Sequence, residues 1–85
     1  MNQHSEKELL DALRAARSAY MSLSTEYDSM LFHAHSYGHG STEMLEALRK
    51  ATRLAPKVQE ALRHYFETVQ RLAKFYQEKR HIAEG

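Results

Sequence analysis

The sequence lacks cysteine and is poor in chain-breaking residues, with one proline and three glycines among 85 residues. Without cysteine the chain can form no disulfide, no thiolate metal site and no cysteine nucleophile. No apolar run approaches the roughly 20 residues that a membrane-spanning helix needs, and the first residues lack the charged-then-apolar layout of a signal peptide. We therefore expect a cytoplasmic protein with no membrane segment and one small domain over residues 1–85.

Charge of one sign is not in excess either, since 12 basic residues stand against 11 acidic ones and the net charge is +1. A chain this close to neutral has no general attraction to nucleic acid or to anionic membranes. The charges are nevertheless unevenly distributed, with a net charge of −4 over residues 1–46 and +5 over residues 47–85. One interpretation is an acidic helix that lies antiparallel to a basic one.

The other interpretation is a small nucleic-acid-binding regulator whose second helix supplies the basic residues. These residues are Arg49, Lys50, Arg53, Lys57, Arg63, Arg71 and Lys74. Acidic residues interrupt the series, and the segment Leu54-Ala55-Pro56 offers no glycine-containing turn of the kind that a helix-turn-helix motif uses. We keep nucleic-acid binding as the alternative function and do not expect it to be the main one.

The spacing of apolar residues predicts two long helices. Before and after a turn at Gly38 and Gly40, apolar residues recur at alternating steps of four and three. The first series is Leu9, Leu13, Ala16, Tyr20, Leu23, Tyr27, Met30, Ala34 and Tyr37, and the second is Met44, Leu48, Ala51, Ala55, Val58, Leu62, Tyr65, Val69, Leu72 and Tyr76. A spacing that averages 3.5 residues is the heptad pattern of helices packed in a left-handed seam. We predict an all-α antiparallel helical hairpin, coiled-coil-like, with a first helix over about 5–37, a turn over 38–41 and a second helix over about 42–80.

Local signals support these boundaries. Ser5 and Glu8 match a capping box, and Ser41 or Thr42 can cap the second helix. Pro56 lies inside the second series, where it removes a backbone hydrogen bond and crowds the preceding turn. Because the heptad spacing continues through Pro56 and no Gly, Asn or Asp precedes it, we predict a kink in one helix. The alternative is a break that would give three helices.

The two series also predict a register for the antiparallel pair. If facing residues have numbers that sum to about 78, Tyr27 faces Ala51 and Tyr20 faces Val58. Large side chains then meet small ones, which keeps the volume of the seam even along its length. A wrong register would instead stack tyrosine on tyrosine.

A lone hairpin of this kind leaves apolar residues uncovered on both flanks of its seam. We expect these flanks to bind a protein partner, either as a homodimer that forms a four-helix bundle or as a heteromer. The anchor residues that we predict are Leu10, Leu54, Phe66, Phe75 and Ile82. The alternative is a monomer whose flanks cover one another after the chain bends at Pro56, although so short a chain builds little core.

Histidine forms the one chemical cluster, because three of the six histidines, His33, His35 and His39, lie close to the turn. Imidazoles at this spacing could bind Zn, Ni or Cu if the last helical turn frays. On an intact helix His33 and His35 point about 200° apart and cannot share an ion. A solvated polar loop is the simpler interpretation, and we predict no metal site and no cofactor.

Catalytic motifs are missing from the sequence, which has no glycine-rich phosphate loop, no G-x-S-x-G and no H-E-x-x-H. A hairpin also lacks the concave pocket in which water is excluded and pKa values are shifted. We therefore expect neither an enzyme nor a small-molecule substrate. The function that we predict is a protein-binding adaptor or chaperone-like subunit that acts by burying a helix face against its partner.

Overall fold

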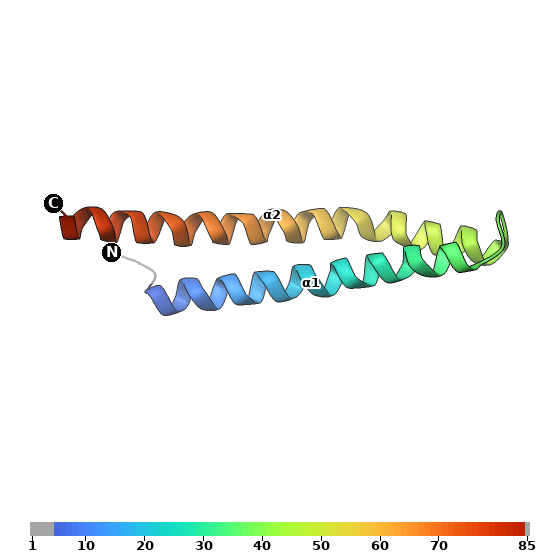
Figure 1. The fold of residues 1–85 in the computed structure, drawn as a ribbon, viewed down its shortest axis with the longest axis horizontal. Coiled ribbons are helices and arrows are strands. Elements are labelled where there is room, and N and C mark those ends of the chain that lie inside the picture. Colours follow the sequence, from blue (N-terminus) through green and yellow to red (C-terminus); the bar gives the residue numbers. More distant parts are fainter. Residues whose placement is uncertain (1–4, 85) are drawn as a thin grey trace.

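The computed structural model describes residues 5–84, and it describes side-chain surroundings for residues 5–80. Two α-helices make up the fold, with α1 spanning Glu6–Ser36 and α2 spanning Thr42–Glu84, and the described residues contain no strand. The helices run antiparallel, side by side, as a hairpin in which α2 extends beyond the start of α1 (Figure 1). The longest dimension is 64 Å, the length of a helix of 43 residues. The all-α prediction with two long helices is confirmed, and α2 runs past the end expected near residue 80.

The helix ends follow the local signals in the sequence. The Ser5 hydroxyl accepts a hydrogen bond from the Glu8 amide at 3.2 Å, and the Glu8 carboxylate accepts one from the Ser5 amide at 3.0 Å. These are the two halves of the predicted capping box. In the turn, Gly40 has a φ of 74°, which glycine adopts without steric strain. Ser41 then caps α2, because its hydroxyl accepts from the Met44 amide at 3.2 Å.

Pro56 does not divide α2, which continues through it as one helix. The three-helix alternative is therefore wrong, and a kink at Pro56 stays a prediction. Residues on both sides of the proline are buried, with Ala51 and Leu54 before it and Thr68 after it. Packing along α1 on both sides stabilises the continuous helix against the loss of one backbone hydrogen bond.

The face of α2 that packs against α1 differs from the predicted face. Leu54 and Thr68 are buried, whereas Leu62, Val69 and Tyr76 are 46%, 41% and 41% exposed, although the heptad series placed them in the seam. The seam of α2 consists of Ala47, Ala51, Leu54, Val58, Ala61, Tyr65, Thr68, Leu72 and Phe75. At 100° per residue, this seam is rotated by about 50° from the predicted one. The predicted seam of α1 is buried or half-buried from Leu9 to Ala34.

The predicted register is also wrong. Tyr20 packs near Tyr65, with ring centroids 6.0 Å apart and ring planes at 31°, instead of facing Val58. The numbers of these two residues sum to 85, and those of the hydrogen-bonded pair Glu6 and Tyr76 sum to 82, against the expected 78. The physical reason is that tilted aromatic rings at this distance attract each other. A contact between tyrosines was therefore the wrong criterion for rejecting a register.

The core of this hairpin is thin. The buried apolar residues among those described are three alanines and two leucines, and no large side chain is less than 2% exposed. The chain exposes 6697 Å², whereas a compact protein of 9.9 kDa exposes about 5,200 Å². Its radius of gyration is 19.0 Å, compared with about 12 Å for a compact chain of this length. The hairpin therefore leaves about 1,500 Å² more surface exposed than a compact fold would.

Candidate interaction surface

One side of the hairpin is polar. Near the turn, a shallow hollow between the helices is lined by His33 of α1 and by Glu43 and Lys50 of α2. Farther along, a second hollow on this side is lined by Lys57 and His64. The polar row of α2 is Glu43, Glu46, Lys50, Arg53, Lys57, Glu60, His64, Glu67, Arg71, Lys74 and Glu78. Charged residues of both signs follow one another along this row, as expected of a solvated face.

Ion pairs beside the polar row are local to α2. The Arg63 Nε donates to Glu60 Oε1 at 3.2 Å, and its Nη1 donates to Glu67 Oε2 at 2.6 Å. The hydrogen bond from Arg63, together with its positive charge, lowers the pKa of Glu60, and the same bond raises the pKa of Arg63. These side chains are exposed by 38% to 65%, so water screens the pairs and they add little to stability. Arg63 thus finds its partners within its own helix.

The opposite flank of α2 carries no charge over ten successive positions of one row. The outer row of α2 is Leu45, Leu48, Thr52, Ala55, Gln59, Leu62, Phe66, Val69, Ala73 and Tyr76. Its steps alternate between three and four residues, so its members lie along one face of the helix. Leu62, Phe66, Val69 and Tyr76 are between 41% and 57% exposed. The row is interrupted by the uncharged polar residues Thr52 and Gln59, and Leu48 and Ala55 are half-buried. A largely apolar row with large exposed side chains is typical of a surface that packs against another protein.

A second row, on α1, lies on the same side of the hairpin. His33 is on the polar side, so Leu31, which is two residues and about 200° away, lies on the opposite flank of α1. In α2, Leu48 is likewise two residues from Lys50, which lies on the polar side, so Leu48 lies on the opposite flank. The outer row of α1 is Leu10, Arg14, Arg17, Met21, Ser24, Asp28 and Leu31. We call the surface formed by the two outer rows the apolar side, after the uncharged row of α2. The row of α1 within it also carries the charged residues Arg14, Arg17 and Asp28, and its Met21 is 48% exposed.

The structure separates the predicted anchor residues from one another. Phe66 is 57% exposed in the outer row of α2, and Leu10 is half-buried in the outer row of α1. Leu54 is only 9% exposed, because the rotation of α2 brings it into the seam, and its expected place on an open flank is wrong. Phe75 is half-buried in the same seam. The side chain of Ile82 lies outside the described residues.

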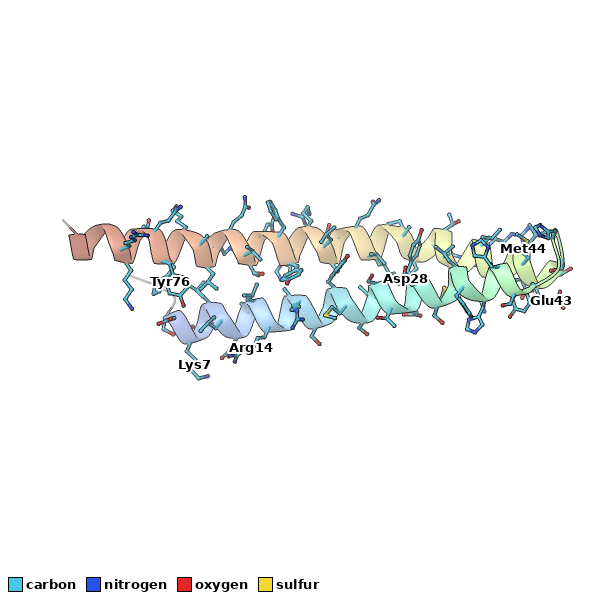
Figure 2. The ribbon with its side chains drawn as sticks, in the orientation of Figure 1. Lys7, Arg14, Asp28, Glu43, Met44 and Tyr76 are labelled. Atoms are coloured by element: carbon cyan, nitrogen blue, oxygen red, sulfur yellow. The ribbon has the colours of Figure 1, made fainter. Side chains whose placement is uncertain are left out.

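Tyr76 connects the open end of the hairpin while belonging to the outer row. Tyr76 lies on α2 near the start of α1 (Figure 2), and its hydroxyl donates to Glu6 Oε2. Lys79 Nζ lies 4.0 Å from Glu6 Oε1. The hydrogen bond to Glu6, followed by desolvation, raises the pKa of Tyr76 above its ordinary value of 10.0. The residue remains 41% exposed. Its polar tip is therefore engaged within the hairpin, and part of its surface remains open to a partner.

The turn histidines do not gather into a cluster. Among the residues whose side chains the structure describes, no three His, Asp or Glu side chains come together as metal ligands would. His33 Nδ1 instead lies 3.4 Å from the Ser29 hydroxyl one turn earlier in α1. His35 and His39 are exposed. The geometry of the turn gives no support to a metal site at His33, His35 and His39.

The basic residues of α2 do not form a continuous stripe. Along the polar row they occur in two short groups, Lys50, Arg53 and Lys57 and then Arg71 and Lys74, separated by acidic residues. Arg63 is held between Glu60 and Glu67. The continuity of α2 at Pro56 also leaves no turn for a helix-turn-helix motif. Nucleic-acid binding therefore gains no specific support from the geometry, and it stays the alternative prediction.

Comparison of the chain with protein-family models, with curated proteins and with solved structures finds no match. Neither helix, over the residues described, has a stretch that is long and apolar enough to cross a membrane. The chemistry of the two sides of the hairpin is therefore the basis for a functional proposal.

The spacing of apolar residues missed two features of α2, one in its seam and one on its outer face. Thr68 is 3% exposed, and its hydroxyl donates to the Tyr65 carbonyl at 2.6 Å. A threonine that satisfies its own hydroxyl in this way can occupy a seam without an unpaired polar group. The second missed feature is the outer row of α2, because the heptad series assigned only every second member of it, such as Leu62 and Val69, to the seam. Its signal in the sequence is the lack of charge at ten positions, not their spacing.

Proposed function

We propose that this chain is a small protein–protein interaction module, an adaptor or chaperone-like subunit, that binds its partner by burying the apolar side of the hairpin. The observation that carries the proposal is the uncharged outer row of α2, in which Leu62, Phe66 and Val69 are 41–57% exposed. Burial of apolar surface contributes about 25 cal/mol per Å². Covering this row with another helix therefore stabilises the complex relative to the separate chains.

We further propose that the row is covered when hairpins pair into a four-helix bundle. The hairpin exposes about 1,500 Å² more surface than a compact chain of its mass because it is elongated, and pairing along its length would reduce this excess. The thin seam between α1 and α2 supports the same proposal, because chains of this length need further packing to be stable. The polar side offers no comparable surface.

The substitution Phe66→Glu tests the proposed function, and His64→Glu on the polar row is its matched control. Both residues are exposed and lie in the same turn of α2, so each variant gains one carboxylate at a site that tolerates it. We expect Phe66→Glu to abolish association while helicity is retained, because a charge would be buried without a partner. We expect His64→Glu to associate as the unmodified chain does. Sedimentation velocity measures the association, and circular dichroism measures the helicity.

Two results would contradict the proposal. If Phe66→Glu associates with itself and with other proteins as well as His64→Glu does, the outer row is not a binding surface. If Phe66→Glu loses helicity and association together, Phe66 is a core residue of the hairpin.

A further inference from the structure

We infer that the partner of the apolar side is a second copy of this chain, related to the first by a two-fold axis in an antiparallel four-helix bundle with the two turns at opposite ends. The inference rests on the proposed function and names the occupant of that surface. It follows from a self-complementary pattern in both outer rows.

The outer row of α2 lies at the angle that a bundle requires. At 100° per residue, the centre of this row is about 100° around the helix from the centre of the seam with α1. A helix at the corner of a four-helix bundle contacts its two neighbours in directions roughly 90° apart. One face of α2 therefore packs on α1, and the outer row is turned toward a second neighbour.

The outer row of α2 is complementary to itself in the antiparallel direction. When facing residues have numbers that sum to 121, every member of the row faces another member of the row. The pairs are Leu45 with Tyr76, Leu48 with Ala73, Thr52 with Val69, Ala55 with Phe66, and Gln59 with Leu62. The exposed Phe66 thus meets the small Ala55 of the second copy, which keeps the interface evenly filled. No charge enters this α2–α2 contact.

The outer row of α1 is complementary to itself at its centre and at its charged pair. When facing residues have numbers that sum to 42, Met21 faces the same residue of the second copy, and Arg14 faces Asp28. This pair joins opposite charges twice, once on each side of the two-fold axis, and fixes the orientation of the copies. At this sum Arg17 faces Thr25, which neighbours Ser24 of the row, with the second copy's Asp28 one turn farther along.

The two complementary rows agree on the position of the axis. The row of α1 places it at Met21, and the row of α2 places it between Gln59 and Leu62. In the hairpin, Leu23 and Ala61 line the same hollow between the helices, so these levels lie side by side. One two-fold axis therefore serves both rows within about one helical turn.

Parallel pairing of the same surfaces is unfavourable. In a parallel pair, with both turns at the same end, the two-fold axis runs along the helices and places α1 of each copy against α2 of the other. Arg14, Arg17 and Asp28 would then lie against the uncharged outer row of α2, with no opposite charge facing them. The antiparallel arrangement places α1 against α1, so that Arg14 faces Asp28.

Engineered cysteines test the arrangement directly, because the chain has no cysteine of its own. We expect Thr52→Cys and Val69→Cys to form a disulfide-linked dimer only when the two variants are mixed. Within the proposed bundle each of these residues is about 26 Å from its own copy, and a disulfide needs Cα atoms within about 7 Å. Met21→Cys should link to itself, whereas Ala15→Cys, on another flank of α1, is the matched control and should not. Non-reducing electrophoresis after mild oxidation gives the yield, and circular dichroism confirms that each variant is helical.

The outcomes separate the inference from the proposed function. Links in Val69→Cys without Thr52→Cys would show an antiparallel pair centred on residue 69, and a dimer that forms no link in any combination would show the parallel pair, in which α2 faces α1 of the other copy. Either result overturns the inference and leaves an interaction module in place. A helical chain that forms no link and has the mass of one chain in light scattering overturns the second copy as the occupant. The proposed function fails separately, when Phe66→Glu changes no association at all.

Discussion

The two flanks of α2 have opposite chemistry although they belong to the same helix. The polar row from Glu43 to Glu78 is charged at every position except His64, and the outer row from Leu45 to Tyr76 has no charge at all. Both rows lie beside the seam with α1, so contact with α1 does not explain the difference. A flank that only faces water has no reason to exclude charge over ten positions. The contrast supports the proposal that the outer row packs against a partner.

The largest expected difference is between Leu54→Ala in the seam and Leu62→Ala in the outer row. Leu54 is 9% exposed and Leu62 is 46% exposed. Loss of a buried leucine costs about 3 kcal/mol, so Leu54→Ala should destabilise the hairpin at every protein concentration. Leu62→Ala should reduce stability only at concentrations at which chains associate. Urea unfolding of both variants at several protein concentrations measures this, and an equal, concentration-independent loss would remove the distinction between seam and outer row.

Charge reversal at the α1 contact should have the next largest effect. We expect Arg14→Asp to weaken dimerisation about tenfold, because it replaces two attractive pairs with two repulsive ones at a solvated site. The combined variant Arg14→Asp with Asp28→Arg should recover most of the affinity. Sedimentation equilibrium at low salt measures both dissociation constants. Failure of the combined variant to improve on the single one would mean that these residues do not face each other.

A smaller effect of the opposite sign is expected at Arg17. This residue faces Thr25 in the proposed bundle and has no acidic residue directly opposite, so its charge opposes burial of the apolar side. Arg17→Met should tighten dimerisation a few-fold, with Lys7→Met, outside the outer row, as the matched control. Light scattering over a dilution series measures the change. Weaker dimerisation of Arg17→Met would show that its guanidinium binds the second copy.

The smallest expected effect is on the pH dependence of stability. The hydrogen bond to Glu6 raises the pKa of Tyr76 above 10.0, so its contribution to stability is complete below pH 10 and is lost as the pH rises through the raised value. Tyr76→Phe should therefore be slightly less stable than the unmodified chain at neutral pH, and the two should converge at strongly alkaline pH. Thermal unfolding across this range measures the difference, with Tyr37→Phe, far from Glu6, as control. A constant difference at all pH values would mean that the bond does not form.

Much of the fold could be predicted from the sequence because its signals are local. The capping box at Ser5 and Glu8 and the turn at Gly40 each depend on a few neighbouring residues. The face of α2 could not be chosen in this way. Two series with heptad spacing run along α2, one through Leu48 and Leu62 and one through Leu54 and Thr68. They share Ala51, Val58, Tyr65 and Leu72, so spacing does not distinguish them.

The wide apolar arc of α2 explains the error and also the candidate surface. A helix that packs on one neighbour needs one narrow apolar stripe, whereas α2 has enough apolar residues for two. Spacing alone cannot say which stripe packs on α1. Of the predicted anchors, Phe66 is exposed on the apolar side and Leu54 is buried, because the stripe that contains Leu54 is the one that packs on α1.

The most direct test of a second copy on the apolar side is the mass of the protein in solution by light scattering, with and without EDTA. We predict about twice the chain mass of 9.9 kDa in both conditions, because the proposed contacts are apolar and ionic and involve no metal. A mass of one chain at all concentrations would contradict the account. A dimer that dissociates in EDTA would contradict it too, because a metal would then join the two chains.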